Sequence, residues 1–559
     1  MQVELDCHLS IITQDEMLSD LLIGKSPYQF DIILINAIQD VWRHNPKLIL
    51  EQRERDAQIY LTDEYRQVSD YAIRRNLQCS TINAYIEVDE VPIRFCSGGS
   101  ESMTMLIQRS PEEPVIVRKI LSEALTTAKW NSDGRGVMLP PFAKAARQVD
   151  YLRGLPEHIK YFFPQVYSVI EREILAPTGR GCVGKVTCKE VIYEMSFIEG
   201  EEVSQFVQHS NISPLVISKL YEVILTFLRD NVHSENRQAV TSKTLDVSYF
   251  KKIEERLMLC RNTAPQCFGP NLLDSEKIVI NGNEYFNIKS LLHIFRSHPE
   301  YLYVLEPRYH SLVMGDTNTE NIKIGNILPL LEVQDLIDHN RSGEEISRAL
   351  AVINAKDIQL RFLDPRAIGF QSDGANSRDD YMYDNKPWHN SIGHYDEYHN
   401  DLFTLTININ AQKIPIIDIR FSENNVYQRA YGIADCAMDD INPLNDPTNI
   451  GMEKYFSHVM NALYDNTNPD SIYLRDDPYW LVRFVFMMGT HFAAMPPFHF
   501  ISEFDGTIKD SIDTQSRPVA IYCEGIKWLN WALEILQGKR DHFLGVNVPP
   551  IKTIVEEAI

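Results

Sequence analysis

Hydrophobic and polar positions repeat with different periods along the chain, and each change of period marks a predicted element. Residues 1–90 place apolar side chains at helical spacing and predict a mainly helical N-terminal extension. Residues 91–120 show short apolar runs separated by glycine- or proline-containing turns, which predicts three successive strands. Helical spacing dominates again beyond residue 199. The pattern therefore predicts an α+β chain with a strand-rich region between helical ones.

Several elements have clear local signals. Residues 142–155 predict a helix that ends at a Gly-Leu-Pro stretch, and residues 190–200 predict a strand that runs into a glycine turn. Residues 278–286 predict a hairpin, because Asn-Gly is a strong turn signal. Residues 230–300 and 325–357 are expected to be insertions, and the polar composition of the second predicts a surface position.

Composition narrows the class of protein. The length of 559 residues suggests roughly two to four domains of about 150 residues each. The hydrophobic content of 44% and the charged content of 23% are typical of globular proteins. The net charge of −23 argues against a nucleic acid or an anionic membrane surface as the main partner. No apolar run reaches about 18 residues, so no membrane span is expected.

The cysteines and the first residues bear on the compartment. Nine cysteines are scattered without a Cys-x-x-Cys pair, which favours reduced thiols over disulfides or a zinc site. Residues 1–16 lack the basic start and the apolar run of a signal peptide. We therefore expect a cytoplasmic protein.

Polar groups suited to phosphoryl transfer follow two predicted strands. An apolar run leads into Gly315 and Asp316, and Asn321 stands just before a short strand. A second strand, residues 360–363, ends on Asp364. Phosphoryl transfer needs a carboxylate that orients the attacking hydroxyl and accepts its proton, and oxygen ligands that hold Mg²⁺ against the nucleotide phosphates. Asp316 is the predicted catalytic base, and Asn321 and Asp364 are the predicted metal ligands.

These residues match a known pattern. Gly315, Asp316 and Asn321 fit the motif Gly-Asp-x-x-x-x-Asn, and Asp364 fits the metal-binding aspartate after the next strand. On these motifs the chain resembles the aminoglycoside phosphotransferase and choline kinase family, a branch of the protein-kinase-like fold, over roughly residues 90–540. A narrower similarity links two stretches to phosphotransferase-like proteins of polysaccharide and capsule biosynthesis loci: Asp364-Pro-Arg366, and the group Tyr383, Asp384, Lys386, His389, Ser391 and Gly393. Met314 and Ala367 depart from the patterns of those relatives.

The resemblance implies a two-lobed fold. The kinase-like N-lobe would span residues 91–198, and an enlarged, α-rich C-lobe would span residues 199–559. It also implies ATP or GTP with Mg²⁺ as the nucleotide and its metal. A glycine turn over the phosphates is expected at Gly98, Gly99 and Ser100. The cation at the end of the third strand would be Arg118 or Lys119. The backbone of a hinge strand against the base is expected at Glu194, Met195 and Ser196.

One position departs from the standard kinase arrangement. A kinase-like fold has an acidic residue in the helix after the third strand, where it pairs with the strand cation. In helix 142–155 the candidates are Gln148 and Asp150, and the better register gives Gln148, which carries no charge. This substitution keeps open a catalytically inactive kinase-like protein that binds a nucleotide or acts as a scaffold.

The favoured function is transfer of a γ-phosphoryl group to a hydroxyl of a sugar, an amino sugar or an amino alcohol. The residues after the metal strand supply candidate substrate contacts: Arg366, Asp384, Lys386 and His389. His389 could instead lock the local conformation. Acidic residues between 379 and 401 could receive a cationic acceptor, or could belong to a solvated loop. A protein-directed kinase or nucleotidyltransferase is the third option. Neither the acceptor nor the oligomeric state is predicted.

Overall fold

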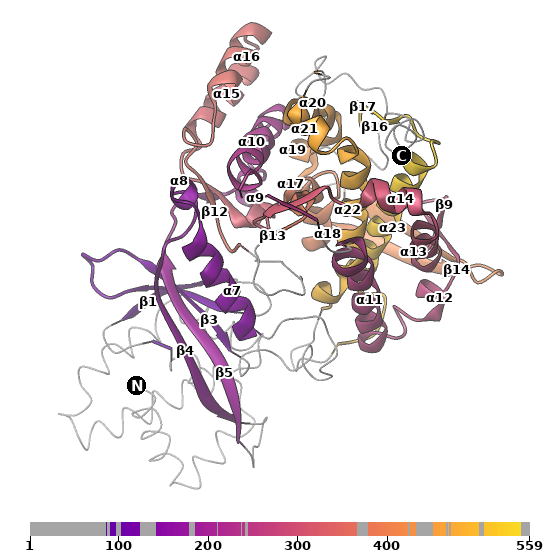
Figure 1. Ribbon diagram of the computed structural model, residues 1–559, viewed down its shortest axis with the longest axis horizontal. Helices are drawn as coiled ribbons and strands as arrows, with labels where there is room; N and C mark the ends of the chain where they lie inside the picture. Colours follow the sequence, from indigo (N-terminus) through magenta and orange to yellow (C-terminus); the bar gives the residue numbers. More distant parts are fainter. Residues whose placement is uncertain are drawn as a thin grey trace.

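The computed structural model describes residues 85–86, 90–96, 102–122, 141–177, 185–209, 211–235, 237–240, 244–365, 378–422, 425–431, 451–465, 468, 471–501 and 508–548. These residues form a mixed α/β structure with several small sheets (Figure 1). Almost all of the predicted N-terminal helical extension lies outside the described residues. In the described ranges no helix combines the length and the apolar character needed to cross a membrane.

The strand-rich region is a five-stranded antiparallel sheet. In spatial order its strands are β1 (Val91–Cys96), β2 (Met103–Gln108), β3 (Ile116–Ser122), β5 (Lys185–Ser196) and β4 (Val166–Pro177). The first three are the strands predicted between residues 91 and 120. Helix α7 (Pro141–Gly154) lies on this sheet and closes a small apolar core made of Leu121, Ala145, Val149, Val191 and Tyr193.

Two small, separate sheets are formed by strands that follow this region in the chain. One contains β7 (Gln238–Ala239), β10 (Tyr309–Leu312) and β13 (Arg378–Asp379). The other contains β6 (Glu201–Glu202), β11 (Ile322–Ile324) and β12 (Leu360–Phe362), with Ile322 opposite Phe362. Strands β10 and β11 lead into and out of the predicted catalytic loop, so these sheets position that loop.

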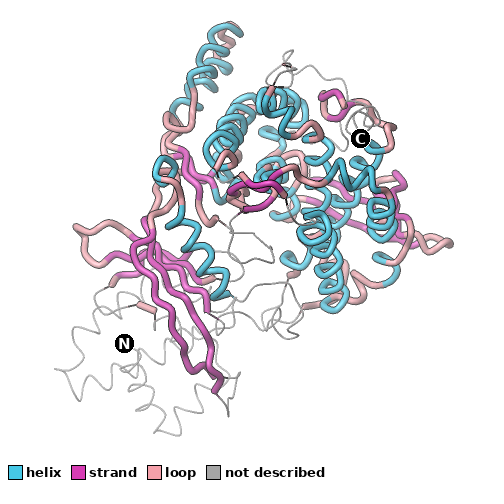
Figure 2. Tube along the Cα trace, viewed as in Figure 1, coloured by secondary structure: helices cyan, strands magenta, loops and turns pink. Residues whose placement is uncertain are grey.

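Long helices form the main core (Figure 2). They are α10 (Pro214–Phe227), α20 (Met452–Tyr464), α22 (Trp480–Ala493) and α23 (Ser516–Leu536), all beyond residue 199, where helical spacing dominates the sequence. Helices α22 and α23 approach so closely that a Cβ on Gly525 would lie 2.4 Å from the backbone nitrogen of Ala493. Glycine is therefore required where these two backbones meet.

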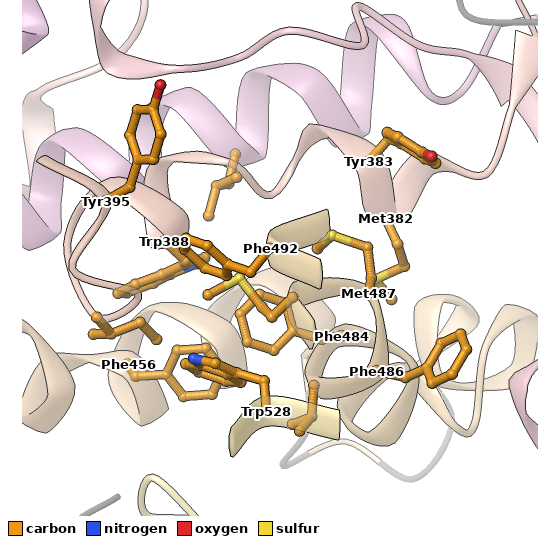
Figure 3. Packing of buried hydrophobic residues seen from close by; sticks show 14 of the residues in the cluster. Met382, Tyr383, Trp388, Tyr395, Phe456, Phe484, Phe486, Met487, Phe492 and Trp528 are labelled. Atoms are coloured by element: carbon orange, nitrogen blue, oxygen red, sulfur yellow. The ribbon is translucent and has the colours of Figure 1, made fainter. Parts of the chain in front are cut away.

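Aromatic side chains fill the space between these helices and the segment after β13. Trp388 packs edge-on against Phe456 with 5.0 Å between ring centroids, and Phe456 lies 5.1 Å from Phe484 (Figure 3). Trp528 of α23 continues the series, 6.2 Å from Phe484. Buried aromatic contacts of this kind hold the segment that carries Trp388 rigidly on the helical core.

The two predicted insertions behave differently. Within residues 230–300, helices α11 (Lys251–Thr263) and α13 (Ile288–Ser297) contribute buried side chains to the main core. Strands β8 (Lys277–Ile280) and β9 (Asn283–Phe286) form the predicted hairpin, with positive φ at its Asn-Gly turn. Within residues 325–357, α15 (Leu328–Asp338) and α16 (Gly343–Val352) project from the body, and α16 buries no residue (Figure 1). The predicted surface position therefore holds for α16, whereas α15 buries Leu330, Val333, Gln334 and Ile337.

The remaining elements are short. Strands β14 (Phe403–Ile409) and β15 (Pro415–Phe421) form a four-stranded sheet with β8 and β9, and β16 (His542–Phe543) pairs with β17 (Val546–Asn547). The helices are α8 (Glu157–Lys160), α9 (Val203–Phe206), α12 (Pro270–Leu273), α14 (Pro299–Leu305), α17 (Pro387–Asn390), α18 (Tyr395–His399), α19 (Gln428–Tyr431) and α21 (Ile472–Asp476). Single 3₁₀ or π turns lie at Leu228–Val232, Leu245–Phe250, Thr319–Asn321, Tyr381–Asp384 and Pro496–His499.

Candidate functional site

Asp384 fastens the loop that follows β10. Its carboxylate accepts hydrogen bonds from the backbone N–H groups of Met314, at 2.8 Å, and Gly315, at 2.6 Å. Nε2 of His233 lies 2.8 Å from the same carboxylate, and the hydroxyl of Thr317 donates to the carbonyl of Asp384 at 2.8 Å. Gly315 has a φ of 79°, a left-handed conformation that glycine adopts without strain. Asp384, a predicted substrate contact, is thus fully buried and holds the turn that presents Asp316.

Asp316 is buried within this loop and pairs with a lysine. Nζ of Lys386 donates to Oδ1 of Asp316 at 2.6 Å, and Nδ2 of Asn318 donates to the same oxygen at 3.1 Å. The ammonium offsets part of the cost of burying the carboxylate. The backbone carbonyl of Asp316 accepts a hydrogen bond from Nδ2 of Asn321 at 3.1 Å. The predicted base is therefore held from both its side chain and its backbone.

Backbone pairing brings the two predicted metal ligands to neighbouring positions. The N–H of Leu363 donates to the carbonyl of Asn321 at 2.7 Å, and Asp364 follows with a φ of 51°. A carbonyl can only accept, so the amide nitrogen of Asn321 must face Asp316 and its Oδ1 points elsewhere. That Oδ1 makes no hydrogen bond within the described part of the chain. Carboxylate and amide oxygens suit Mg²⁺, which takes its other ligands from phosphates and water.

Lys119, Gln148 and Asp364 meet where the five-stranded sheet faces this loop. Nζ of Lys119 forms an ion pair with Oδ1 of Asp364 and donates to Oε1 of Gln148 at 3.2 Å. Nε2 of Gln148 donates to Oδ1 of Asp364 at 2.5 Å. The hydroxyl of Tyr193 donates to Oε1 of Gln148. Gln148 thus occupies the position predicted for the helix acid, whereas Asp150 is exposed on α7.

Arg118 lies on the other face of β3, because successive strand residues point to opposite faces. Its guanidinium donates to both carboxylate oxygens of Glu90, at 2.5 and 2.6 Å, and also pairs with Glu194. Although burial raises the pKa of the Glu194 carboxyl, the hydrogen bond and charge of Arg118 lower it below its usual value. Of the two predicted strand cations, only Lys119 reaches Asp364.

The predicted hinge residues lie inside the sheet. Glu194 and Met195 of β5 pair with β3 on one side and with β4 on the other, and the N–H of Ser196 donates to the carbonyl of Gln165 at 2.9 Å. The sheet therefore engages the backbone that was expected to contact a nucleotide base. The first backbone beyond the strand is residues 197–200. Gly98, Gly99, Ser100 and Arg366 lie outside the described residues.

His389 lies on α17, where its backbone N–H donates to the carbonyl of Lys386. Its ring is buried and contacts the rings of His491, at 4.7 Å between centroids, and Phe492, at 5.1 Å. Burial and the nearby charges of Lys386 and Lys252 lower the pKa of His389 well below its usual value. The ring is therefore neutral at physiological pH.

No protein-family model matches this chain, and no curated protein sequence matches it. The family resemblance therefore stays a prediction that rests on the short motifs.

Sequence reasoning missed several residues of the site. His233 supports Asp384, Tyr193 orients Gln148, and Oδ1 of Asn390 accepts the backbone N–H of Thr319 at 3.2 Å. Each contact joins residues that are far apart in the chain, so no local sequence pattern predicts it. The described residues contain no group of three or more histidine, cysteine or acidic side chains suited to a metal ion. A metal at Asn321 and Asp364 would thus need further ligands from its substrate.

Proposed function

We propose that this chain is a phosphotransferase that moves the γ-phosphoryl group of ATP or GTP to a hydroxyl of a small molecule. The observation that carries the proposal is the convergence of Asp316, Lys386, Asn321, Asp364 and Lys119 from distant parts of the sequence. A base, two cations and two oxygen ligands are the groups that in-line phosphoryl transfer requires.

In the proposed mechanism Asp316 orients the acceptor hydroxyl and takes its proton. Lys386, within hydrogen-bond distance of Asp316, neutralises charge on the oxygens of the transferred group. Asn321 and Asp364 would hold Mg²⁺, which would neutralise charge on the β- and γ-phosphates. Positioning and charge neutralisation supply most of the rate enhancement, because the transition state of this reaction is loose.

The direct contact between Lys119 and Asp364 must open during this reaction. Lys119 would turn to the phosphates while Asp364 turns to the metal. Gln148 contacts both side chains and carries no charge, so it can keep a hydrogen bond to either of them after they separate.

The proposed architecture is a two-lobed, protein-kinase-like fold. The sheet β1 to β5 with α7 would be the smaller lobe, and the helical region with β10 to β12 would be the larger lobe. The nucleotide base would meet the backbone of residues 197–200 instead of residues 194–196, because the sheet engages the latter. The contact of Lys119 with Asp364 joins the two parts at the proposed phosphate position.

The test is nucleotide consumption by the full chain. ATP or GTP with Mg²⁺ should raise the melting temperature, and γ-labelled phosphate should move to an acceptor from a panel of sugars, amino sugars and amino alcohols. Asp316→Asn should bind nucleotide as the unmodified chain does and lose turnover. Turnover at the unmodified rate in Asp316→Asn contradicts the mechanism.

A catalytically inactive nucleotide-binding protein is the second candidate. It is favoured by Gln148, which replaces an acid, and by the ion pair of Asp364 with Lys119. It predicts a thermal shift with nucleotide but no γ-phosphate transfer to any acceptor. Label that enters protein from γ-labelled ATP would indicate a protein-directed kinase, and label from α-labelled ATP a nucleotidyltransferase.

A further inference from the structure

Two histidine rings beside the Asp316 loop make no hydrogen bonds within the described part of the chain. Nδ1 and Nε2 of His389 are buried and without a partner. His491 of α22 is half-buried and packs edge-on against His389, with an interplanar angle of 68°. A neutral imidazole carries one N–H donor and one acceptor nitrogen, and leaving both unmet in a buried place costs free energy. The pair therefore has unused hydrogen-bonding capacity next to the proposed base.

Positive charge surrounds this pair. Lys386 contacts Asp316, and Lys252 of α11 donates to the hydroxyl of Tyr383 at 2.5 Å. The ring of Tyr383 in turn lies 5.3 Å from that of His491. Burial and then Lys386, His389, Lys252 and Arg256 lower the pKa of His491 well below its usual value. Both rings are therefore neutral and can donate and accept, as a hydroxyl group does.

Several acidic residues of this segment are bound by other groups or hold a proton. Asp380 accepts hydrogen bonds from Arg483, at 2.6 Å, and from the hydroxyl of Tyr249, at 2.7 Å. Burial raises the pKa of Asp396 to about 8, so this side chain is mostly neutral at physiological pH. Asp384 is bound to the loop backbone. Oδ2 of Asp379 is buried without a partner among the described residues, but burial raises the pKa of this carboxyl to about 7, so it is only partly ionised. The negative charge beside the two rings is therefore smaller than the number of acidic residues suggests.

We propose that His389 and His491 bind hydroxyl groups of an anionic carbohydrate, whose carboxylate or phosphate is attracted by Lys252 and Arg256. This inference rests on the proposed phosphotransferase function and names the acceptor class. It differs from the cationic acceptor that the acidic composition of residues 379–401 suggested. The hydroxyl that receives the phosphoryl group would lie next to Asp316, on the same side of the two histidine rings as Lys386.

The first experiment measures acceptor binding without nucleotide, so that it does not depend on phosphoryl transfer. Isothermal titration of the full chain would compare glucuronate and glucose 6-phosphate with glucose and glucosamine. We expect at least one anionic probe to bind about ten-fold or more tightly than both uncharged glucose and cationic glucosamine, because the attraction of opposite charges strengthens where water is partly excluded. Equal affinities, tighter binding of glucosamine, or no binding of any probe would overturn the proposal.

The second experiment assigns the contacts. His491→Phe keeps an aromatic ring at this position and removes both nitrogens. It should lower the affinity for the anionic probe by about ten-fold. Lys252→Gln should reduce the preference for the anionic probe over glucose. His339→Phe, at the exposed residue that directly follows α15, is the matched control and should leave both affinities unchanged. Unchanged affinity in a folded His491→Phe variant means that water alone satisfies the ring, and it overturns the assignment.

The two proposals fail in different ways. If ATP with Mg²⁺ neither binds nor turns over while the anionic probe binds through His491, the phosphotransferase function fails and the recognition site stands as a binding site only. If γ-phosphate reaches glucose or glucosamine while the anionic probes do not bind, the acceptor class is wrong and the phosphotransferase function stands.

Discussion

Asp316 and His389 are both buried and lie in neighbouring parts of the molecule, yet the polar groups at the two places are bound to very different extents. In the loop, Asp384 satisfies two backbone N–H groups, and the carboxylate of Asp316 accepts from Lys386 and Asn318. In the His389–His491 pair, the nitrogens of His389 have no partner among the described residues. Satisfied buried groups hold a geometry, whereas unsatisfied ones keep the capacity to bind something else. The loop is therefore suited to positioning, and the pair is suited to recognition.

The largest expected effect comes from Asp384→Ala, which removes the carboxylate that holds the Asp316 loop. It leaves the N–H groups of Met314 and Gly315 without an acceptor, and we expect a loss of about 3–5 kcal/mol in the free energy of unfolding together with all phosphoryl transfer. Urea denaturation measures the first effect. Asp384→Asn keeps one oxygen acceptor and should lose less. Equal stability of the alanine variant would show that the loop does not depend on this carboxylate.

Asp316→Asn separates chemistry from architecture within the loop. The amide keeps an oxygen acceptor for Lys386 but cannot take a proton, so we expect turnover to fall by about 10²–10⁴-fold with little change in nucleotide affinity. Steady-state kinetics and nucleotide titration give the two values. Asn318→Ala, which removes only a hydrogen bond to Asp316, is the control and should cost far less turnover.

Asp396 is a buried carboxyl that accepts hydrogen bonds and whose protonation state can be tested. Oδ1 accepts from Asn390 at 2.5 Å, Oδ2 accepts from Tyr431 at 2.8 Å, and burial raises its pKa from 3.8 to about 8. The folded state therefore holds the proton more tightly than the unfolded state. The contribution of this proton to the free energy of unfolding is complete below pH 3.8 and is lost progressively as the pH rises to about 8.

The measurement is the free energy of unfolding between pH 4 and 9 for the unmodified chain and for Asp396→Asn. The amide cannot ionise, so the variant should lose less stability as the pH rises and should gain on the order of 1–3 kcal/mol relative to the unmodified chain near pH 8. Parallel pH profiles would show that Asp396 is ionised in the fold. Asp401→Asn, at a mostly exposed carboxyl, is the control and should leave the profile unchanged.

The smallest expected effect comes from Gln148→Glu, which restores the acid of the standard kinase arrangement. A second carboxylate next to Asp364 would compete for Lys119 and free Asp364 for Mg²⁺. We expect a few-fold lower Mg²⁺ requirement of nucleotide consumption. The effect should be modest because Gln148 is buried but Asp364 is partly exposed, so water screens the electrostatic interactions of Asp364. A higher Mg²⁺ requirement would mean that Gln148 is better matched to this site than an acid.

The sequence predicted the parts of the site that depend on local order. A loop between two short strands joins Asp316 to Asn321, and the pairing of β11 with β12 joins Asn321 to the strand before Asp364, so short motifs were enough to group them. The alternation of β3 decided between Arg118 and Lys119, but sequence alone does not say which face meets the site. The residues predicted as a hinge belong to the sheet, because β5 extends through Ser196.

Other parts of the site depend on contacts between distant residues. Asp384 binds the backbone of Gly315, Lys386 binds Asp316, and His389 packs on His491 of another helix. Sequence patterns place such residues on elements but do not say which elements meet. This is why Asp384 and Lys386 were predicted as substrate contacts, whereas in the structure Asp384 binds the backbone of the Asp316 loop and Lys386 pairs with Asp316.

The projecting helices α15 and α16 offer an experimental handle on this protein. Helix α16 buries no residue and begins with a Ser342 capping box, in which Ser342 and Glu345 exchange hydrogen bonds, so its start is stabilised locally and not by the body of the molecule. A reporter domain or a helical fusion partner joined there would extend a helix that already stands in solvent. Rigid attachment at this position would give imaging or immobilisation experiments a fixed orientation while leaving the residues around Asp316 untouched.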